Sequence, residues 1–94
     1  MFIVRNTFTA KPGMASKLAK LLKETMAEMS GVKVRIMTDY IGPMNSVSME
    51  MEVETIADFE RNFKEYGERA DIQAKMKDYT GMYSEGRREI YKVV

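Results

Sequence analysis

Residues 32–54, VKVRIMTDYIGPMNSVSMEMEVE, predict two β-strands, 32–41 and 46–54, joined by a tight turn. Polar and apolar side chains alternate along both segments, which is the period of a strand with one buried face. The four residues between them, Gly42-Pro43-Met44-Asn45, are typical of a turn. The stretch therefore predicts an antiparallel hairpin with two chemically different faces.

A four-residue loop would place Ile41 opposite Ser46 and would fix the pairing along the whole hairpin. The pairs predicted on the apolar face are Val34 with Val53, Ile36 with Met51, Thr38 with Met49 and Tyr40 with Val47. The pairs predicted on the polar face are Lys33 with Glu54, Arg35 with Glu52, Met37 with Glu50 and Asp39 with Ser48. Two of these are opposite-charge pairs, which stabilise a ladder. A slip by one residue would move every side chain to the wrong face.

The segments on either side of the hairpin predict the other strands and helices of the domain. The patterns predict a strand over 2–10, an amphipathic helix over 14–29 that ends at Ser30-Gly31, and a second helix that begins after Thr55 and is interrupted at Gly67. A short helix over 70–79, a glycine-punctuated loop over 80–86 and a last strand over 87–94 follow. Thr55 and Asp58 form a variant of the capping box at the start of the second helix. Two strand-helix-strand units with right-handed crossovers give an α+β fold, a four-stranded antiparallel sheet of ferredoxin-like βαββαβ topology.

Composition limits the possible functions. The 94 residues are expected to form one domain, 1–94, with 15 basic and 14 acidic residues spread along the chain. Without a basic stripe, nucleic acid is not an expected partner. No apolar run is long enough for a membrane span, so we expect no membrane partner and a cytoplasmic location. The sequence contains no Cys, His or Trp, so the commonest general base is missing.

Three segments resemble the dimeric α/β-barrel superfamily, in particular antibiotic-biosynthesis-monooxygenase-like and NIPSNAP-like domains. They are residues 2–8 followed by Lys11-Pro12-Gly13, residues 54–59 at the start of the second helix, and residues 85–94. The resemblance covers essentially the whole chain. It implies a homodimer whose sheets close into a barrel, with a cavity in each subunit. It also implies functions that range from cofactor-independent oxygenases and haem-degrading enzymes to proteins without known catalysis.

The sheet face that the helices leave open is the expected dimer interface. It carries charges of both signs next to apolar side chains, a mixture that suits a self-complementary contact. A solvated face is the alternative. The residues predicted at the interface are Arg5, Arg35, Met37, Glu50 and Glu52. Glu50, Glu52 and Glu54 are expected to pair with basic neighbours, so no metal site is predicted.

Asn6 is the clearest candidate for a ligand site, because it is an amide on a strand face otherwise built from Phe2, Val4 and Phe8. In haem-degrading members of the superfamily an Asn on the first strand lines the pocket, but their His and Trp have no counterpart here. The alternative is that Asn6 bonds a backbone group or a Tyr hydroxyl inside the core.

Aromatic residues extend this candidate site. The predicted ligand-binding residues are Asn6, Tyr40, Phe63, Tyr79 and Tyr83. The alternative is an ordinary core, for which many of the Met and aromatic residues have the right spacing. Arg87 and Arg88 could bind a carboxylate or phosphate. Adjacent strand residues point to opposite faces, so the two cannot both serve one ligand and a surface role for at least one is favoured.

These observations lead to a functional hypothesis without an assigned catalytic residue. We expect a dimeric protein that binds a small molecule. Its expected activity is that of a cofactor-independent monooxygenase acting on a small aromatic or polycyclic compound, and we expect it to need no cofactor. The alternative is a non-enzymatic stress-related or regulatory dimeric module with a filled core.

Overall fold

The alternating segments form one sheet. The computed structural model describes residues 1–27, 29 and 31–94, and this part of the chain contains four strands in the order β2-β3-β1-β4. They are β1 (Phe2–Ala10), β2 (Lys33–Thr38), β3 (Ser46–Val53) and β4 (Tyr83–Lys92), and all neighbouring strands are antiparallel. The predicted ferredoxin-like α+β fold is confirmed.

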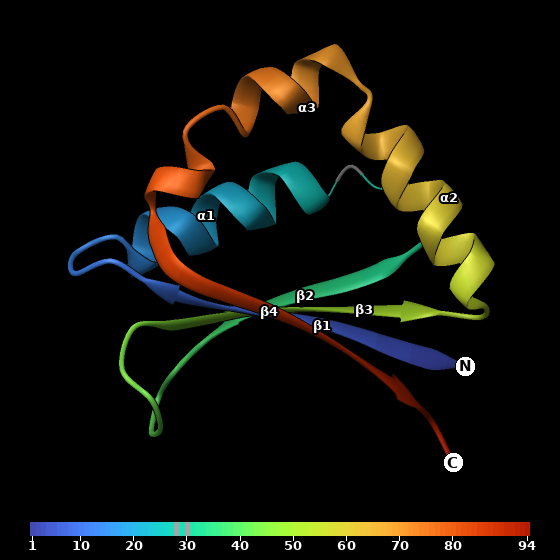
Figure 1. Cartoon of the computed structure of the whole chain (residues 1–94), viewed down its shortest axis with the longest axis horizontal. Helices are drawn as coiled ribbons and strands as arrows, with labels where there is room; N and C mark the ends of the chain where they lie inside the picture. Colours follow the sequence, from blue (N-terminus) through green and yellow to red (C-terminus); the bar gives the residue numbers. More distant parts are fainter. Residues whose placement is uncertain (28, 30) are drawn as a thin grey trace.

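The helices lie on one side of this sheet (Figure 1). They are α1 (Ala15–Met26), α2 (Ile56–Gly67) and α3 (Ala70–Lys75), and a single 3-10 turn, η1 (Tyr79–Gly81), leads into β4. No helix in the described part of the chain is long and apolar enough to cross a membrane.

The predicted register of the β2–β3 hairpin is wrong by two residues. Lys33 lies opposite Glu52, and Arg35 lies opposite Glu50. The reason is a longer loop: Asp39, not Ile41, lies opposite Ser46, since the Asp39 amide donates to the Ser46 carbonyl oxygen at 3.1 Å. A shift of two keeps every side chain on its predicted face, because the side-chain period of a strand is two.

β4 begins four residues earlier than predicted. The predicted strand over 2–10 is confirmed in β1, which pairs with β3 on one side and with β4 on the other. β4 starts at Tyr83, opposite Ala10, and a register irregularity between Thr9 and Ala10 accommodates the start of the pairing. The glycine at position 86, which suggested a loop, lies inside the ladder opposite Phe8.

The ends of the helices depend on local geometry. α1 ends at Met26, three residues before the predicted end at Met29. Ser30 of the predicted ending lies outside the described residues, and Gly31 has φ +75°, a value that favours glycine. The predicted cap of α2 is confirmed, because the Asp58 amide donates to Thr55 Oγ1 at 3.0 Å.

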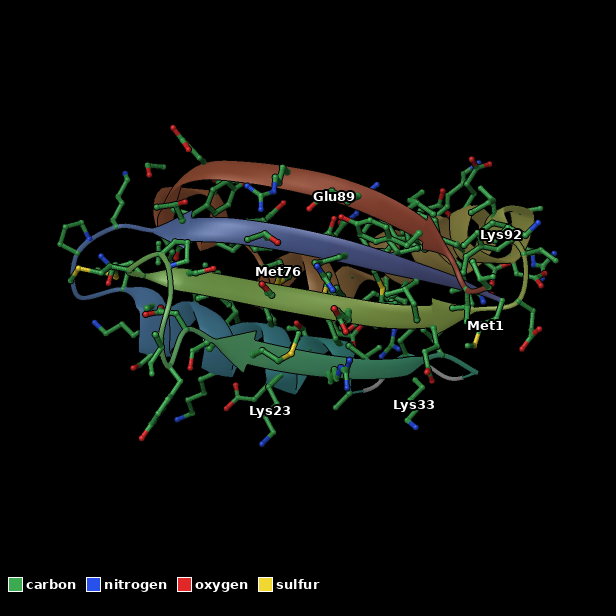
Figure 2. All side chains as sticks on the ribbon, turned by 90° about the horizontal axis from the view of Figure 1, so that it is seen from below. Met1, Lys23, Lys33, Met76, Glu89 and Lys92 are labelled. Carbon is green, nitrogen blue, oxygen red and sulfur yellow. The ribbon has the colours of Figure 1, made fainter. Side chains whose placement is uncertain are left out.

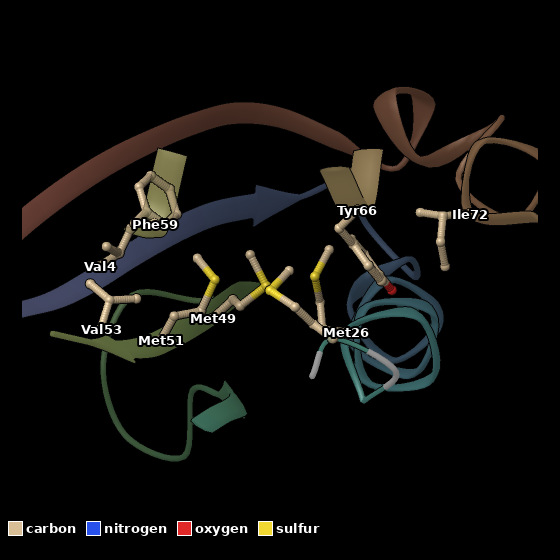
Figure 3. Packing of buried hydrophobic residues seen from close by; sticks show 9 residues of the cluster. Val4, Met26, Met49, Met51, Val53, Phe59, Tyr66 and Ile72 are labelled. Atoms are coloured by element: carbon tan, nitrogen blue, oxygen red, sulfur yellow. The ribbon is translucent and has the colours of Figure 1, made fainter. Parts of the chain in front are cut away.

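The core fills the space between sheet and helices. The buried side chains come from the helix-facing side of β1 and β3 and from all three helices (Figure 3). The largest cluster consists of Val4, Met26, Met29, Met49, Met51, Val53, Phe59, Tyr66 and Ile72. A second cluster of Ala10, Leu18, Leu22 and Val47 lies beside it. Figure 2 shows the opposite side of the sheet, which no helix covers.

Candidate functional site

An open cavity lies between the helix-facing side of β1 and β4 and the helices above it. Its volume is about 330 Å³. Side chains from six elements and the connections between them line it: Asn6, Phe8, Leu22, Met26, Met49, Phe63, Met76, Tyr79, Tyr83, Gly86, Arg87 and Arg88. We call it the Asn6 cavity.

Four of the five residues predicted to bind a ligand line this cavity. Asn6 comes from β1, Phe63 from α2, Tyr79 from η1 and Tyr83 from the start of β4. Tyr40 does not line it. The predicted place of Tyr40 in a strand opposite Val47 is wrong, because the chain leaves β2 at Thr38 and Tyr40 is 97% exposed in the loop.

Aromatic rings form one wall of the cavity. The ring centroids of Phe8 and Tyr83 are 4.8 Å apart, and those of Tyr79 and Tyr83 are 5.7 Å apart. Burial and the neighbouring Tyr79 hydroxyl raise the pKa of Tyr83 above its ordinary value of 10.0. The Tyr83 hydroxyl therefore keeps its proton at neutral pH and can donate a hydrogen bond.

Gly86 gives this wall its shape. A Cβ atom at this position would lie 3.2 Å from Cδ1 of Phe8 and 3.4 Å from Cε2 of Tyr83. These contacts are tight, so a side chain at position 86 would push against both rings. Glycine at this position leaves the two rings in contact along the cavity wall.

The polar part of the cavity is built by Asn6 and Arg88. Asn6 is 5% exposed, and its side-chain oxygen Oδ1 accepts a hydrogen bond from Nε of Arg88 at 2.8 Å. The two residues lie opposite each other in the β1–β4 ladder. The partner of Asn6 is therefore an arginine, not the backbone group or Tyr hydroxyl considered as the alternative to a ligand site.

The sequence marked Arg87 and Arg88 as possible anion-binding residues but did not connect Arg88 with Asn6. Its guanidinium carbon lies 5.4 Å from the ring centroid of Phe59 and 5.1 Å from that of Phe63. Arg87 and Arg88 were predicted to point to opposite faces of the strand, and they bond different partners. Nε of Arg87 donates to Oε1 of Glu89 at 3.2 Å, whereas Arg88 bonds Asn6 across the ladder.

The outer sheet face carries a compact charge cluster. Glu50 is 6% exposed, with Arg5 Nε donating to its Oε2 at 2.7 Å and Arg35 Nε donating to its Oε1 at 2.9 Å. Hydrogen bonds from Arg35 and Arg5 hold the pKa of Glu50 below its ordinary value of 4.5, although burial acts in the opposite direction.

The other predicted interface residues lie on the same face. Lys33 Nζ is 3.9 Å from Oε2 of Glu52, and Met37 is 36% exposed. Arg5, Arg35, Met37, Glu50 and Glu52 thus share one surface, and Glu50 is already bonded to the two arginines of its own chain.

The fold is shared with solved structures of low sequence identity. An uncharacterized NIPSNAP domain protein from Burkholderia xenovorans superposes with a TM-score of 0.85 at 12% identity, covering 100% of this chain and 95% of that chain. A NIPSNAP family protein from Agrobacterium tumefaciens superposes with a TM-score of 0.85 at 13% identity, covering 99% of this chain and 92% of that chain.

A further match is a candidate antibiotic biosynthesis monooxygenase from Chloroflexus aurantiacus. It superposes with a TM-score of 0.72 at 13% identity, covering 99% of this chain and 93% of that chain. No protein-family model and no curated protein matches the sequence. The resemblance to NIPSNAP-like and antibiotic-biosynthesis-monooxygenase-like domains is confirmed at the level of the fold.

Proposed function

We propose that the Asn6 cavity binds a small aromatic compound and that the protein is a cofactor-independent monooxygenase acting on it. The observation that carries this proposal is the chemistry of the cavity, with aromatic and Met side chains around a single buried amide. Binding sites for small molecules combine apolar walls with a few polar groups that fix orientation. A volume of about 330 Å³ is near the lower end for such sites, so the ligand is small.

Two hydrogen-bond donors can orient an oxygen atom of the ligand. The Tyr83 hydroxyl is protonated at neutral pH, as any tyrosine with a pKa at or above the ordinary 10.0 is, and its pKa is raised further by burial. The side-chain oxygen of Asn6 accepts from Arg88, so its amide nitrogen is the remaining donor of this side chain. A phenolic oxygen placed between them would be held against the aromatic wall.

The proposed reaction uses the substrate itself as reductant. An electron-rich phenolic ring system with an activated CH₂ group reacts with O₂, and both C–H bonds of that group break. One oxygen atom becomes the new carbonyl oxygen, and the other leaves as water with the two hydrogens. The substrate supplies all four electrons, so no flavin, haem or metal takes part.

Thermal unfolding with small phenols, flavin and haem tests the binding step. A ligand present at 100 times its Kd adds about 2.7 kcal/mol of stability, which raises Tm by about 10 °C or more for a domain of this size. We expect a phenol to produce this shift and flavin and haem to produce none. If no phenol raises Tm, the binding function is wrong.

Oxygen uptake tests the chemical step. Anthrone carries an activated CH₂ group, and the protein should increase its rate of oxygen consumption above the spontaneous rate. Tyr83→Phe keeps the ring and removes the hydroxyl, so it should lower this increase while the fold remains intact. An unchanged rate in the presence of the wild-type protein would rule out oxygenation of this substrate class.

The second candidate is the non-enzymatic binding module. The open volume beside Asn6 favours a protein that binds a ligand over one whose core is filled by its own Met and Tyr side chains. Ligand binding without any oxygen uptake would indicate a non-enzymatic binding protein with an open cavity, and the absence of both would indicate the filled-core module.

We also propose that the protein forms a homodimer through the outer sheet face, around Arg5, Arg35, Met37, Glu50 and Glu52. Helices cover only the other side of the sheet, which leaves Met37 36% exposed and Tyr91 45% exposed. Sedimentation equilibrium should give a dimer, and Met37→Glu should shift it toward monomer. Met44→Glu, the same change in the 80% exposed loop, is the control and should leave the dimer unchanged. A monomeric wild-type protein at micromolar concentration would contradict the proposal.

A further inference from the structure

Arg88 differs from every other arginine of the chain. The other five arginines, all in the described part of the chain, each lie within ion-pair distance of a carboxylate: Arg5 and Arg35 with Glu50, Arg61 with Asp58, Arg69 with Asp71, and Arg87 with Glu89. Within the described residues Arg88 has no carboxylate partner, and its Nε bonds a neutral amide. Its two terminal nitrogens have no hydrogen-bond partner among these residues.

The surroundings of Arg88 hold its guanidinium group in place. The hydrogen bond to Asn6 fixes one edge of the group, and the rings of Phe59 and Phe63 lie 5.4 and 5.1 Å from its central carbon. Cation–π contacts of this kind orient a guanidinium group without neutralising it. The terminal nitrogens are therefore the part of Arg88 that remains for a ligand.

The cavity carries positive charge and no opposing negative charge. Arg87 and Arg88 are the charged residues of its lining, and the described residues contribute no Asp or Glu side chain to it. A planar guanidinium fork matches the two oxygens of a carboxylate and binds them with charge-assisted hydrogen bonds.

We propose that the ligand of the Asn6 cavity is a planar aromatic carboxylate, and that the terminal nitrogens of Arg88 bind its carboxylate group. The inference rests on the proposed function, since it requires that an aromatic ligand occupies this cavity. The rings of the ligand pack against Phe8, Tyr79 and Tyr83. Toward the carboxylate Asn6 is a positioning residue, because its Oδ1 holds Arg88, while its amide nitrogen remains the donor for a phenolic oxygen of the ligand.

Matched ligands test the role of the charge. 2-Naphthoate and 2-naphthamide have nearly the same shape and differ in charge, and titration calorimetry measures the Kd of each. The wild-type protein should bind the acid about tenfold more tightly than the amide, the effect of one well-placed charged hydrogen-bond pair. Arg88→Gln should weaken naphthoate about tenfold and change naphthamide by less than twofold.

Arg61→Gln is the control, because it makes the same change at an arginine that does not line the cavity and is paired with Asp58. It should leave both ligands unaffected. If Arg88→Gln lacks a cooperative melting transition, Arg88→Lys takes its place. Lys keeps the charge but lacks the fork, so naphthoate binding should still weaken.

The outcomes separate this inference from the proposed function. If acid and amide bind equally well, or if neither substitution of Arg88 weakens the acid, the carboxylate inference is wrong and aromatic binding stands. If neither compound binds the wild-type protein and no phenol raises its Tm, the proposed function is wrong and this inference falls with it. If phenols bind but naphthoate does not, only the carboxylate inference is wrong.

Asn6→Asp tests the positioning role through selectivity. A carboxylate at this position would pair with Arg88 at the present distance of 2.8 Å and would neutralise it. The variant should lose the preference for acid over amide. It should still bind the amide, because neither naphthalene compound carries the phenolic oxygen that the Asn6 amide nitrogen would bond. A purely structural role would weaken both ligands equally, and that result would contradict the assignment.

Discussion

Gly86 lies directly opposite Phe8 in the β1–β4 ladder, at a position where any side chain would contact the Phe8 ring. Phe8 in turn packs against Tyr83, three residues before Gly86 in the chain. One backbone position without a side chain thus shapes both the ladder and the aromatic wall of the Asn6 cavity.

Gly86→Val should destabilise the protein and weaken ligand binding. Gly86 is exposed, but its Cβ atom would lie 3.2 Å from the Phe8 ring, so the branched side chain would displace the rings of Phe8 and Tyr83 at a cost of about 1–3 kcal/mol. Urea unfolding measures the loss. Glu85→Val, one residue earlier and exposed, should change stability by less than about 0.5 kcal/mol. Equal losses in the two variants would mean that the space beside Phe8 is not the cause.

Glu50→Gln should destabilise the protein at pH 7 by about 1–3 kcal/mol, since it weakens charge-assisted hydrogen bonds to a buried side chain. The folded-state pKa of Glu50 lies below 4.5, so its ionised form adds stability above that pH. This contribution is lost as the pH falls through the lower, folded-state pKa. The difference between wild type and variant should therefore shrink between pH 4.5 and strongly acidic pH.

Urea unfolding of both proteins at pH 7 and at about pH 3 measures this change. Glu52→Gln is the control. Glu52 has a side chain 40% exposed and a Lys33 contact of 3.9 Å, so its substitution should cost less than about 1 kcal/mol at either pH. A pH-independent cost for Glu50→Gln would contradict the assignment of this stabilisation to the charge of Glu50.

Thr55→Ala should cost about 1 kcal/mol, because the Asp58 amide loses the side-chain oxygen that it bonds at 3.0 Å. Thermal unfolding should show the loss as a lower Tm. Thr55→Ser keeps the hydroxyl and should retain most of the stability. A serine variant as unstable as the alanine variant would show that the methyl group, and not the cap, is responsible.

Asp39→Ala should cost about 0.5–1.5 kcal/mol, because Asp39 Oδ1 accepts a hydrogen bond from the Ser46 amide at 2.9 Å and closes the β2–β3 loop. Chemical denaturation measures the difference. Asp39→Asn keeps an acceptor oxygen and should lose less. If both variants lose the same amount, the charge of Asp39 matters and the hydrogen bond does not.

The sequence pattern is sufficient for the fold because alternation decides which face of a strand is buried. Phe2, Val4, Asn6 and Phe8 point toward the helices as the pattern predicts, and β1 has the predicted ends. The register of the hairpin could not be predicted in the same way. A shift by two residues leaves the burial of every side chain unchanged, so the pattern cannot distinguish a four-residue loop from a six-residue one.

The candidate site shows the same limit. Asn6 was identifiable as a polar residue on an apolar face, and Phe63, Tyr79 and Tyr83 join it in the cavity. Arg88 was a candidate anion-binding residue, but its contact with Asn6 was missed because that contact depends on the β1–β4 register. That register requires β4 to begin at Tyr83. Gly86 suggested a loop up to residue 86, so the sequence placed the start of the strand at residue 87. The available signal was the position of Arg88 two residues before Ile90, on the same face of the strand.

The two-residue period of the β2–β3 pairing has a consequence for protein engineering. Residues 40–45 lie between Asp39 and Ser46, which close the loop, and Tyr40, Ile41 and Met44 are 97%, 92% and 80% exposed. If a change in this loop shifts the pairing of β2 with β3 by an even number of residues, every side chain of β2 keeps its face of the sheet. A shift by an odd number of residues would exchange the two faces. The Asn45 carbonyl oxygen accepts from the Ala10 amide at 2.8 Å, so residues 40–44 are the part of the loop in which a foreign epitope could replace the present residues.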